Sequence, residues 1–363
     1  MSTTTGPVPA VNFERVPTEY YPETTFRPNT IMHTIPLNLM FINGGMGDYI
    51  CWMPALEWLM NEARWIKGHA IIPTYFVDFA KYFIEPHMPK WGWREYSEIP
   101  QIPNVNNIAF RGPVELQRES LNATGAHLLT CGWVYFTNKE KAPPGYDRYP
   151  VLKQPDLDNL QLQADAEKLI PGKYAVITTG QTTNSRVVPQ GAWNYIIEYV
   201  RELGLTPVFL GKSRMTTGNP MDIHTRFDPT LRFDLGVDLR DKTDMMQAAA
   251  IMSRAAGVVG HDNGLLHLAG CTNVPIVFGY NIAAPEHREP RRAVGRVYNV
   301  TLGGFGKGSE LPCNFCQSNN NFVIGYNYRE CFHRDLRCMS MLFDNRGARW
   351  KKQIDAALAG GCG

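Results

Sequence analysis

The chain has 363 residues, of which 44% are hydrophobic and 19% are charged, and its formal net charge is +2. This length and composition are typical of a globular protein with two domains, and the nearly balanced charge argues against a general nucleic-acid-binding protein. No apolar stretch approaches the roughly 20 residues that a transmembrane helix needs. Residues 1–17 lack the basic and apolar regions of a signal peptide, so we expect a cytoplasmic protein without a membrane span.

Residues 1–35 hold five prolines and many threonines without a hydrophobic period. This composition predicts an extended arm on the surface of the first domain, and a partner-binding tail is the alternative.

A glycine-rich turn joins the first predicted strand to the first predicted helix. The apolar run 37–42 predicts the strand, residues 43–48 read Asn-Gly-Gly-Met-Gly-Asp, and 49–67 carry apolar residues at helical spacing. The glycine spacing does not complete the pattern of a dinucleotide-binding turn. Asp48, at the mouth of the helix, is either a helix cap or a catalytic base, and its spacing alone leaves both open.

The segment between 68 and 138 has weaker patterns. We expect 84–106, a proline-containing stretch with Trp91, Trp93 and Tyr96, to form a loop that covers the sheet. The strands expected here are Ala70–Pro73, Asn107–Phe110 and Ala126–Thr130, the last followed by Trp133–Phe136.

Residues 139–172 are rich in proline and predict the crossing to a second domain. Strands and helices then alternate, which predicts a doubly wound parallel sheet with ligand-binding loops at the carboxyl ends of its strands. Arg186 and Lys212, in two of these loops, would offer positive charge to a diphosphate. The elements expected are strands Tyr174–Thr178, Thr206–Leu210 and Asp234–Leu239, and helices Gln190–Leu203 and Thr243–Ala256.

The segment Val258–Gly279 contains the most informative turn. A β-branched run ends at Gly260, the polar turn His-Asp-Asn-Gly follows, and a short helix (Leu265–Gly270) leads to a second apolar strand (Val274–Phe278). A helix that begins directly after such a turn offers backbone N–H groups and a positive dipole end to an anion. The turn is therefore a candidate site for the diphosphate of a nucleotide.

Three segments, 44–59, 177–197 and 238–279, together resemble glycosyltransferase family nine, the ADP-heptose heptosyltransferases of lipopolysaccharide synthesis and their relatives. The resemblance implies a GT-B fold, in which two Rossmann-like α/β domains, each a doubly wound parallel sheet, face a cleft. The domains expected are an acceptor domain at 36–165, a nucleotide-sugar domain at 170–345 and a C-terminal helix and tail at 346–363.

The resemblance also implies an enzyme that transfers a sugar with inversion from a nucleotide diphosphate sugar to a saccharide hydroxyl. It gives Asp48 the role of general base, and it places Arg186 where family members usually have a lysine that neutralises the donor phosphates. Asn263 replaces the usual hydroxyl residue of the motif. No catalytic metal is then needed. The donor-binding residues expected are Gly47, Thr179, Gly180, Thr182, Arg186, Gly211, Lys212, Asp262, Asn263, Gly264 and His267.

Four of the eight cysteines, Cys313, Cys316, Cys331 and Cys338, lie within 26 residues. One CxxC pair followed by two further thiols can form a structural zinc site, in which His333 could replace one thiol. Two disulfides or four reduced thiols are the alternatives.

Two other functions are open. The same chemistry could act on a non-saccharide acceptor such as a modified DNA base, which the N-terminal arm and the arginines 288, 291, 292 and 296 would suit. A non-catalytic nucleotide-sugar-binding protein is the other alternative, and an NAD-dependent oxidoreductase is disfavoured by the incomplete glycine pattern.

Overall fold

The computed structural model describes residues 37–42 and 45–62, four short segments between 68 and 132, and most of the chain from 145 to 360. The gaps in this last part are 154–169, 181–185, 187, 214–229, 293–294, 304–309, 312, 317–330 and 332–334. The arm predicted at 1–35 lies outside the described residues. The chain divides near residues 147 and 148 into two compact units.

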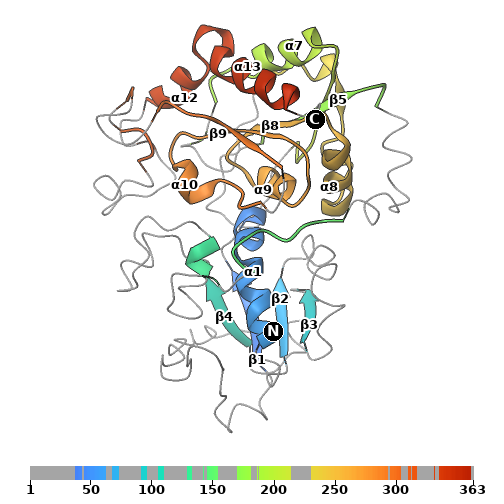
Figure 1. The fold of residues 1–363 in the computed structure, drawn as a ribbon, viewed down its shortest axis with the longest axis vertical. Helices are drawn as coiled ribbons and strands as arrows, with labels where there is room; N and C mark the ends of the chain where they lie inside the picture. Colours follow the sequence, from blue (N-terminus) through green and yellow to red (C-terminus); the bar gives the residue numbers. More distant parts are fainter. Residues whose placement is uncertain are drawn as a thin grey trace, which may run out of the picture. The chain divides into compact units, whose positions relative to one another are not determined.

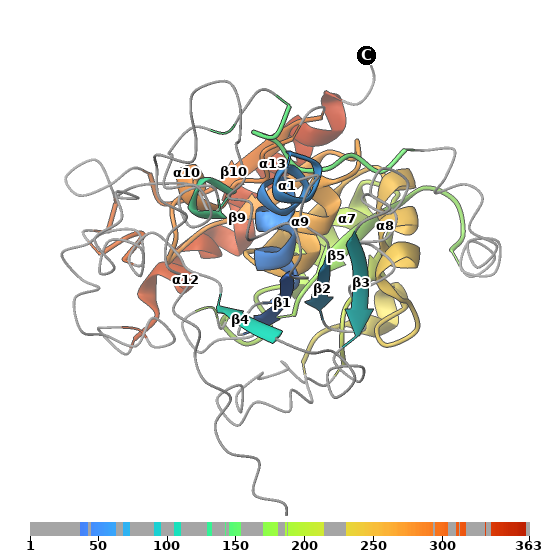
Figure 2. The ribbon, with the colours of Figure 1, turned by 90° about the horizontal axis from the view of Figure 1, so that it is seen from below.

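The first unit is built on a four-stranded parallel sheet in the order β3-β2-β1-β4 (Figures 1 and 2). The central strand β1 pairs on both sides, with Met40 opposite Ile71 of β2 and Asn107 of β4. The strands are β1 (Leu37–Ile42), β2 (Gly68–Ile72), β3 (Trp91–Glu95) and β4 (Val105–Ala109).

Helix α1 (Met46–Glu62) follows β1 directly, as the glycine-rich turn predicts. Its side chains from Tyr49 to Met53 are all at most 1% exposed, so this stretch of the helix is buried on every face. Pro54 lies within the helix. Asp48, in the first turn of the helix, is half-buried and lies next to these buried side chains.

Two expectations for the first unit are wrong. Residues 91–95, expected in a covering loop, form the edge strand β3, because alternating tryptophans suit a strand and β2 offers a partner in register. Residues 129–132, expected partly in a strand, are helical. Gly132 allows this turn to approach α1 closely, since a Cβ there would lie 3.2 Å from Cγ of Trp52.

The second unit is built on a six-stranded parallel sheet in the order β10-β9-β8-β5-β6-β7. Its central strands are buried along their whole length, which is typical of a sheet covered on both faces. The strands are β5 (Tyr174–Thr178), β6 (Thr206–Phe209), β7 (Val237–Asp238), β8 (Val258–His261), β9 (Ile276–Gly279) and β10 (Val297–Val300).

Helices cover both faces of this sheet, with α7 and α13 on one side and α8 and α9 on the other (Figure 1). On the α7 side, Trp193, Phe343 and Trp350 pack ring against ring at centroid distances of 5.0–5.2 Å. The helices are α7 (Asn194–Glu202), η7 (Phe233–Leu235), α8 (Met245–Arg254), α9 (Gly264–Gly270), α10 (Pro285–Arg288), α12 (Arg337–Leu342) and α13 (Asp344–Ala359).

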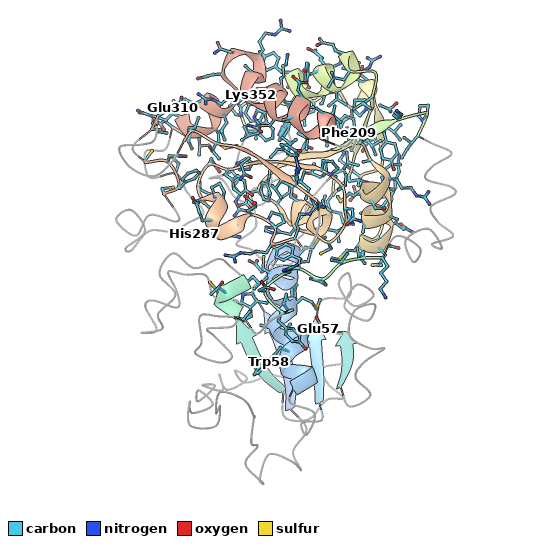
Figure 3. All side chains as sticks on the ribbon, viewed as in Figure 1. Glu57, Trp58, Phe209, His287, Glu310 and Lys352 are labelled. Atoms are coloured by element: carbon cyan, nitrogen blue, oxygen red, sulfur yellow. The ribbon has the colours of Figure 1, made fainter. Side chains whose placement is uncertain are left out.

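The side chains between the sheet and the helices α7 and α13 form one continuous core (Figure 3). Phe209 is fully buried within it, whereas Glu310 lies at the surface and pairs with Arg349 at 2.6 Å. The strand expected at 234–239 is replaced by η7 and the two-residue strand β7. None of the helices in the described ranges is long and apolar enough to cross a membrane.

Candidate functional site

The turn between β8 and α9 is held by the side chain of Asn263, the N-cap of α9. Its Oδ1 accepts hydrogen bonds from the backbone N–H groups of Leu265 (3.0 Å) and Leu266 (3.3 Å), and its Nδ2 donates to Oγ1 of Thr178 (3.1 Å). Both ends of the amide are therefore used within the protein. The N–H of Gly264, the first residue of α9, faces no carbonyl of its own helix.

Two glycines bring the neighbouring loops close to this turn. A Cβ on Gly260 would lie 2.0 Å from Oγ1 of Thr178, so only glycine lets the ends of β8 and β5 approach this closely. Gly211, after β6, has a φ of +121°, and a Cβ there would lie 3.3 Å from Leu265. Because all the strands are parallel, these loops meet at the carboxyl edge of the sheet, where α/β proteins bind ligands.

Asp262 forms a buried ion pair with Arg186. The Oδ2 atom of Asp262 lies 3.0 Å from a terminal nitrogen of Arg186, and the two side chains are only 3% and 12% exposed. A second guanidinium nitrogen donates to the backbone oxygen of Asp262 at 3.2 Å. Burial acts to raise the pKa of Asp262, but Arg186, His267 and Arg288 together hold it well below its usual range. Asp262 is therefore a permanent anion that holds cationic groups around it.

His267, on α9, is fixed between two partners. Its Nδ1 lies 2.7 Å from the hydroxyl oxygen of Tyr149, and its Nε2 lies 3.9 Å from Oδ1 of Asp262. Because the carboxylate lies on the Nε2 side, the proton of the neutral imidazole is favoured on Nε2, and Tyr149 then donates to Nδ1. The edge of Phe278 contacts the ring, with centroids 5.9 Å apart. The arrangement presents an N–H donor at the carboxyl edge of the sheet.

Asp48 lies in the first unit, in the first turn of α1. Its Oδ2 accepts a hydrogen bond from the backbone N–H of Gly45 at 2.9 Å, so Asp48 does act as part of a helix cap. The side chain is half-buried. This capping bond uses one carboxylate oxygen, and it orients the group without removing its charge.

Comparisons with known proteins agree on a family. Residues 139–302 match the model of glycosyltransferase family 9 (heptosyltransferase). A similar solved structure is the iron-containing dodecameric glycosyltransferase TibC from enterotoxigenic Escherichia coli H10407, with 14% identity over 90% of this chain and 76% of TibC, and a TM-score of 0.62. TibC in complex with ADP-D-β-D-heptose gives 14% identity over 90% of this chain and 78% of TibC, and a TM-score of 0.61.

The ADP-heptose lipopolysaccharide heptosyltransferase II of E. coli is also similar, with 12% identity over 90% of this chain and 99% of that enzyme, and a TM-score of 0.52. A search of curated proteins finds no sequence match. The resemblance to glycosyltransferase family nine is confirmed. The α/β fold of the GT-B class and the assignment as a glycosyltransferase follow from it.

The structure gathers part of the donor-binding set expected from family nine. Arg186, Asp262, Asn263, Gly264 and His267 form one connected cluster through the contacts given above. Thr179 and Gly180 directly follow β5, and Gly211 packs against α9, so these residues lie at the same edge.

The other residues expected to bind the donor are not part of this cluster. Lys212 is 65% exposed and lies 3.9 Å from Asp241, so its ammonium group faces solvent beside an acid. Gly47 belongs to the first unit, next to Asp48 in α1. Thr182 lies outside the described residues.

Sequence reasoning missed two residues of this cluster. Tyr149 lies in the proline-rich crossing, 118 residues before His267, and no local pattern links it to the turn. Arg288 was considered only for DNA binding, yet its charge acts to lower the pKa of Asp262. The sequence offers no periodic signal for either position.

The cysteine cluster is partly described, and its four thiols form no disulfide. Burial raises the pKa of Cys338 to about 11, and Cys331 and Cys313 add to this shift. Among the described residues, no three His, Cys, Asp or Glu side chains are placed to hold a metal ion. All four cysteines belong to the described residues, so as placed they do not form the expected four-thiol site. His333, the alternative ligand, lies outside the described residues.

Proposed function

We propose that this protein transfers a sugar, with inversion and without a catalytic metal, from a nucleotide diphosphate sugar to a saccharide hydroxyl. The observation that carries the proposal is the buried cluster of Arg186, Asp262 and His267 at the turn that begins α9. The match of this segment to glycosyltransferase family 9 supports it. TibC, similar in fold, binds ADP-D-β-D-heptose, so a heptosyl donor is the first candidate.

The proposed donor site stabilises the charge that develops on the leaving diphosphate. Arg186, the Nε2–H of His267 and the N–H of Gly264 are the donors, and they are ordered before the ligand binds. Asp262 repels phosphate, so its role is to orient Arg186 and His267 rather than to contact the donor. These groups supply the positive charge that a divalent metal supplies in other transferases.

Asp48 is the proposed general base. It takes the proton of the acceptor hydroxyl while that oxygen attacks the anomeric carbon, and the bond from that carbon to the diphosphate oxygen breaks on the opposite side. A single displacement of this kind inverts the anomeric configuration. The hydrogen bond from Gly45 keeps one carboxylate oxygen in place and leaves the other to receive the proton.

The substitution Asp48→Asn tests this role, because the amide oxygen can still accept the hydrogen bond from Gly45. The release of ADP from ADP-D-β-D-heptose is measured with a panel of saccharide acceptors. We expect turnover to fall about 10²- to 10⁴-fold, the usual range for a lost general base, while donor binding is retained. Glu57→Gln, on the same helix, is the matched control and should retain activity. Full turnover of the Asp48 variant would remove the base assignment.

We also propose that the cysteine cluster holds a structural metal, with zinc as the first expectation. The sequence spacing of Cys313 and Cys316, with Cys331 and Cys338 further along the chain, supports it. The four thiols as placed do not form the site, so binding would require them to move together or a further ligand such as His333. TibC contains iron, so iron has to be measured beside zinc. No step of the transfer reaction depends on this metal.

A further inference from the structure

The hydroxyl of Thr178 joins two loops of the second unit at the carboxyl edge of its sheet. Thr178 is the last residue of β5, and its Oγ1 accepts a hydrogen bond from Nδ2 of Asn263, which lies two residues after β8. The two residues are 85 positions apart in the sequence. Because Thr178 is fully buried, its hydroxyl acts within the protein and does not contact a bound nucleotide.

The pairing of β5 with β8 explains why this hydroxyl reaches the turn. Thr178 lies opposite Gly260 in the parallel register of the two strands. A Cβ on Gly260 would overlap the threonine hydroxyl, so the glycine leaves the space that the hydroxyl occupies. Thr178 and Gly260 together therefore determine where the hydrogen-bond acceptor for Asn263 lies.

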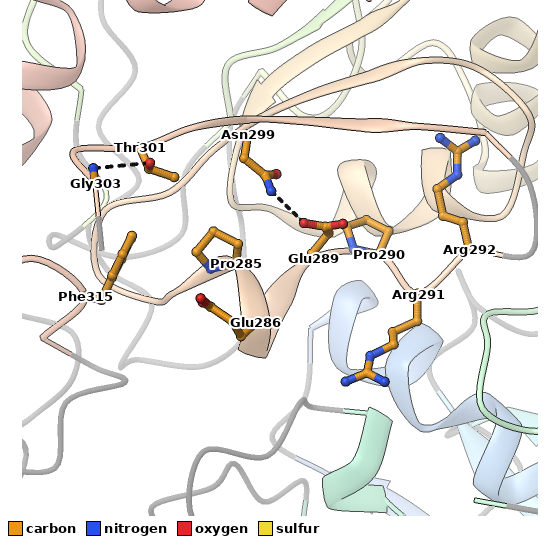
Figure 4. A pocket seen from close by; sticks show the side chains of 10 residues that line it. All are labelled: Pro285, Glu286, Glu289, Pro290, Arg291, Arg292, Asn299, Thr301, Gly303 and Phe315. Carbon is orange, nitrogen blue, oxygen red and sulfur yellow. Dashed lines mark hydrogen bonds between the residues drawn. The ribbon is translucent and has the colours of Figure 1, made fainter. Parts of the chain in front are cut away.

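A bond between two loops differs from a local bond of the same side-chain type. Thr301 follows β10, and its Oγ1 accepts from the backbone N–H of Gly303, two residues later, at 3.3 Å in the wall of the pocket that Figure 4 shows. That bond shapes a single turn. The bond from Asn263 to Thr178 instead holds the turn after β8 against the end of β5.

The amide of Asn263 meets its three partners in one orientation only. Its Oδ1 accepts from the backbone N–H groups of Leu265 and Leu266, and its Nδ2 requires an acceptor, which is Thr178. A half-turn of the amide would bring its NH₂ group against those two backbone N–H groups. If the Thr178 hydroxyl is removed, the amide nitrogen loses its acceptor, and other orientations of the side chain become competitive.

The orientation of Asn263 affects the residue before it. The backbone oxygen of Asp262 accepts a hydrogen bond from Arg186 at 3.2 Å, and the backbone N–H of Asp262 donates to Gly279 at 3.2 Å. A turn that moves at Asn263 therefore moves a backbone atom that helps to hold Arg186.

Resting on the proposed function, we propose that Thr178 is a positioning residue of the donor site. Its hydroxyl fixes the amide of Asn263, the amide fixes the turn, and the turn holds Arg186 where the diphosphate binds. A serine at position 263 would cap the helix with one hydroxyl oxygen and would have no NH₂ group to satisfy. The role of Thr178 should therefore depend on the asparagine.

A double-mutant cycle tests this dependence. ADP is titrated by calorimetry into wild type, Thr178→Val, Asn263→Ser and the double variant, and Thr178→Ser restores the hydroxyl. Valine has nearly the shape of threonine, so it removes the hydroxyl without leaving a cavity. Exchange of the two backbone amide protons that bond to position 263 is followed by NMR and needs no ligand. The matched control is Thr206→Val, because the Thr206 hydroxyl donates to the backbone oxygen of Pro171 at 2.9 Å, at the other end of the sheet.

We expect Thr178→Val to raise the Kd of ADP about tenfold and to speed exchange of the two amides at least fivefold. Thr178→Ser and Thr206→Val should stay within twofold of wild type in both measurements. In the Asn263→Ser background, Thr178→Val should change neither quantity by more than twofold.

A wild-type Kd in Thr178→Val, or an equal effect of Thr178→Val in both backgrounds, overturns the proposal. If wild type binds no ADP, the proposed function is contradicted instead. The exchange rates then decide on Thr178, and equal rates in wild type and Thr178→Val overturn its positioning role.

Discussion

The hydroxyl of Tyr149 lies 2.7 Å from Nδ1 of His267, although 118 residues separate the two in the sequence. Both side chains are only 2% exposed. The hydrogen bond holds the orientation of the His267 ring, while the carboxylate of Asp262 favours the proton on Nε2. Tyr149 is therefore a positioning residue for the donor site.

The substitution Tyr149→Phe should weaken donor binding more than it weakens the fold. Losing one buried hydrogen bond costs about 1 kcal/mol of unfolding free energy. Without the Tyr149 hydroxyl the His267 ring loses the bond that holds its orientation, so we expect about a tenfold higher Kd for ADP, measured by titration calorimetry. Tyr174→Phe is the matched control, because Tyr174 donates to the backbone oxygen of Ile251 at 2.8 Å at the start of β5. Equal ADP affinity in the two variants would contradict the positioning role.

The ion pair of Asp262 and Arg186 should be essential to the fold of the turn. Asp262→Asn leaves the buried guanidinium without its counter-charge, which typically costs about 3–5 kcal/mol. Asp234→Asn is the control, since Asp234 and Arg232 form a comparable pair at the surface, 63% and 48% exposed. Urea unfolding should show a much lower midpoint for Asp262→Asn and an unchanged midpoint for Asp234→Asn. Similar midpoints for the two variants would refute the importance of the buried pair.

Stability should fall as the pH drops below neutrality, because His261 is buried in its neutral form. Burial lowers its pKa to about 4, with Arg186 acting in the same direction and Asp262 against it. The unfolded state, with a pKa near 6.5, binds the proton first, so folding stability decreases from about pH 6.5 down to about pH 4. This group alone contributes about 3 kcal/mol over that range. His261→Gln should remove this part of the pH dependence. The measurement is the unfolding free energy of wild type and variant between about pH 4 and pH 7, and an equal change with pH in both proteins would contradict the assignment.

The cysteine cluster should copurify with one metal ion per chain. Elemental analysis of the purified protein measures zinc and iron together. Cys313→Ser should lose the metal and lower the melting temperature, because metal binding adds directly to folding free energy. Cys51→Ser, a buried thiol in α1, should retain the metal. If wild-type protein purified without chelators contains no metal, the metal site is contradicted and the thiols are reduced packing residues.

The strand–turn–helix unit from Val258 to Gly270 could be predicted from sequence, since a β-branched run, a glycine turn and an apolar helix are all local signals. Asn263 shows the limit of that reasoning. Its residue type fits both a phosphate ligand and a helix cap, and only the positions of Thr178, Leu265 and Leu266 show the second use.

Elements that depend on distant partners could not be predicted in the same way. The strand β3 exists because β2 lies beside it in register, and Trp91 and Trp93 alone also fit a loop. Tyr149 belongs to the cluster because its chain segment packs within the second unit, where its N–H donates to the backbone oxygen of Arg291. Tertiary contacts of this kind leave no periodic trace in a single sequence.

The most direct test of the account is nucleotide binding by variants of the proposed diphosphate site. ADP, UDP and GDP are titrated into wild type, Arg186→Lys, the double variant Arg186→Met with Asp262→Asn, and Asp48→Asn. The double variant removes both buried charges together, so neither is left unpaired. The nucleotide that binds wild type most tightly should bind the double variant at least tenfold more weakly. Arg186→Lys should retain most of the affinity for this nucleotide, and Asp48→Asn should bind it as wild type does. Unchanged affinity of the folded double variant, or no binding of any of the three to wild type, would contradict a diphosphate site at this turn.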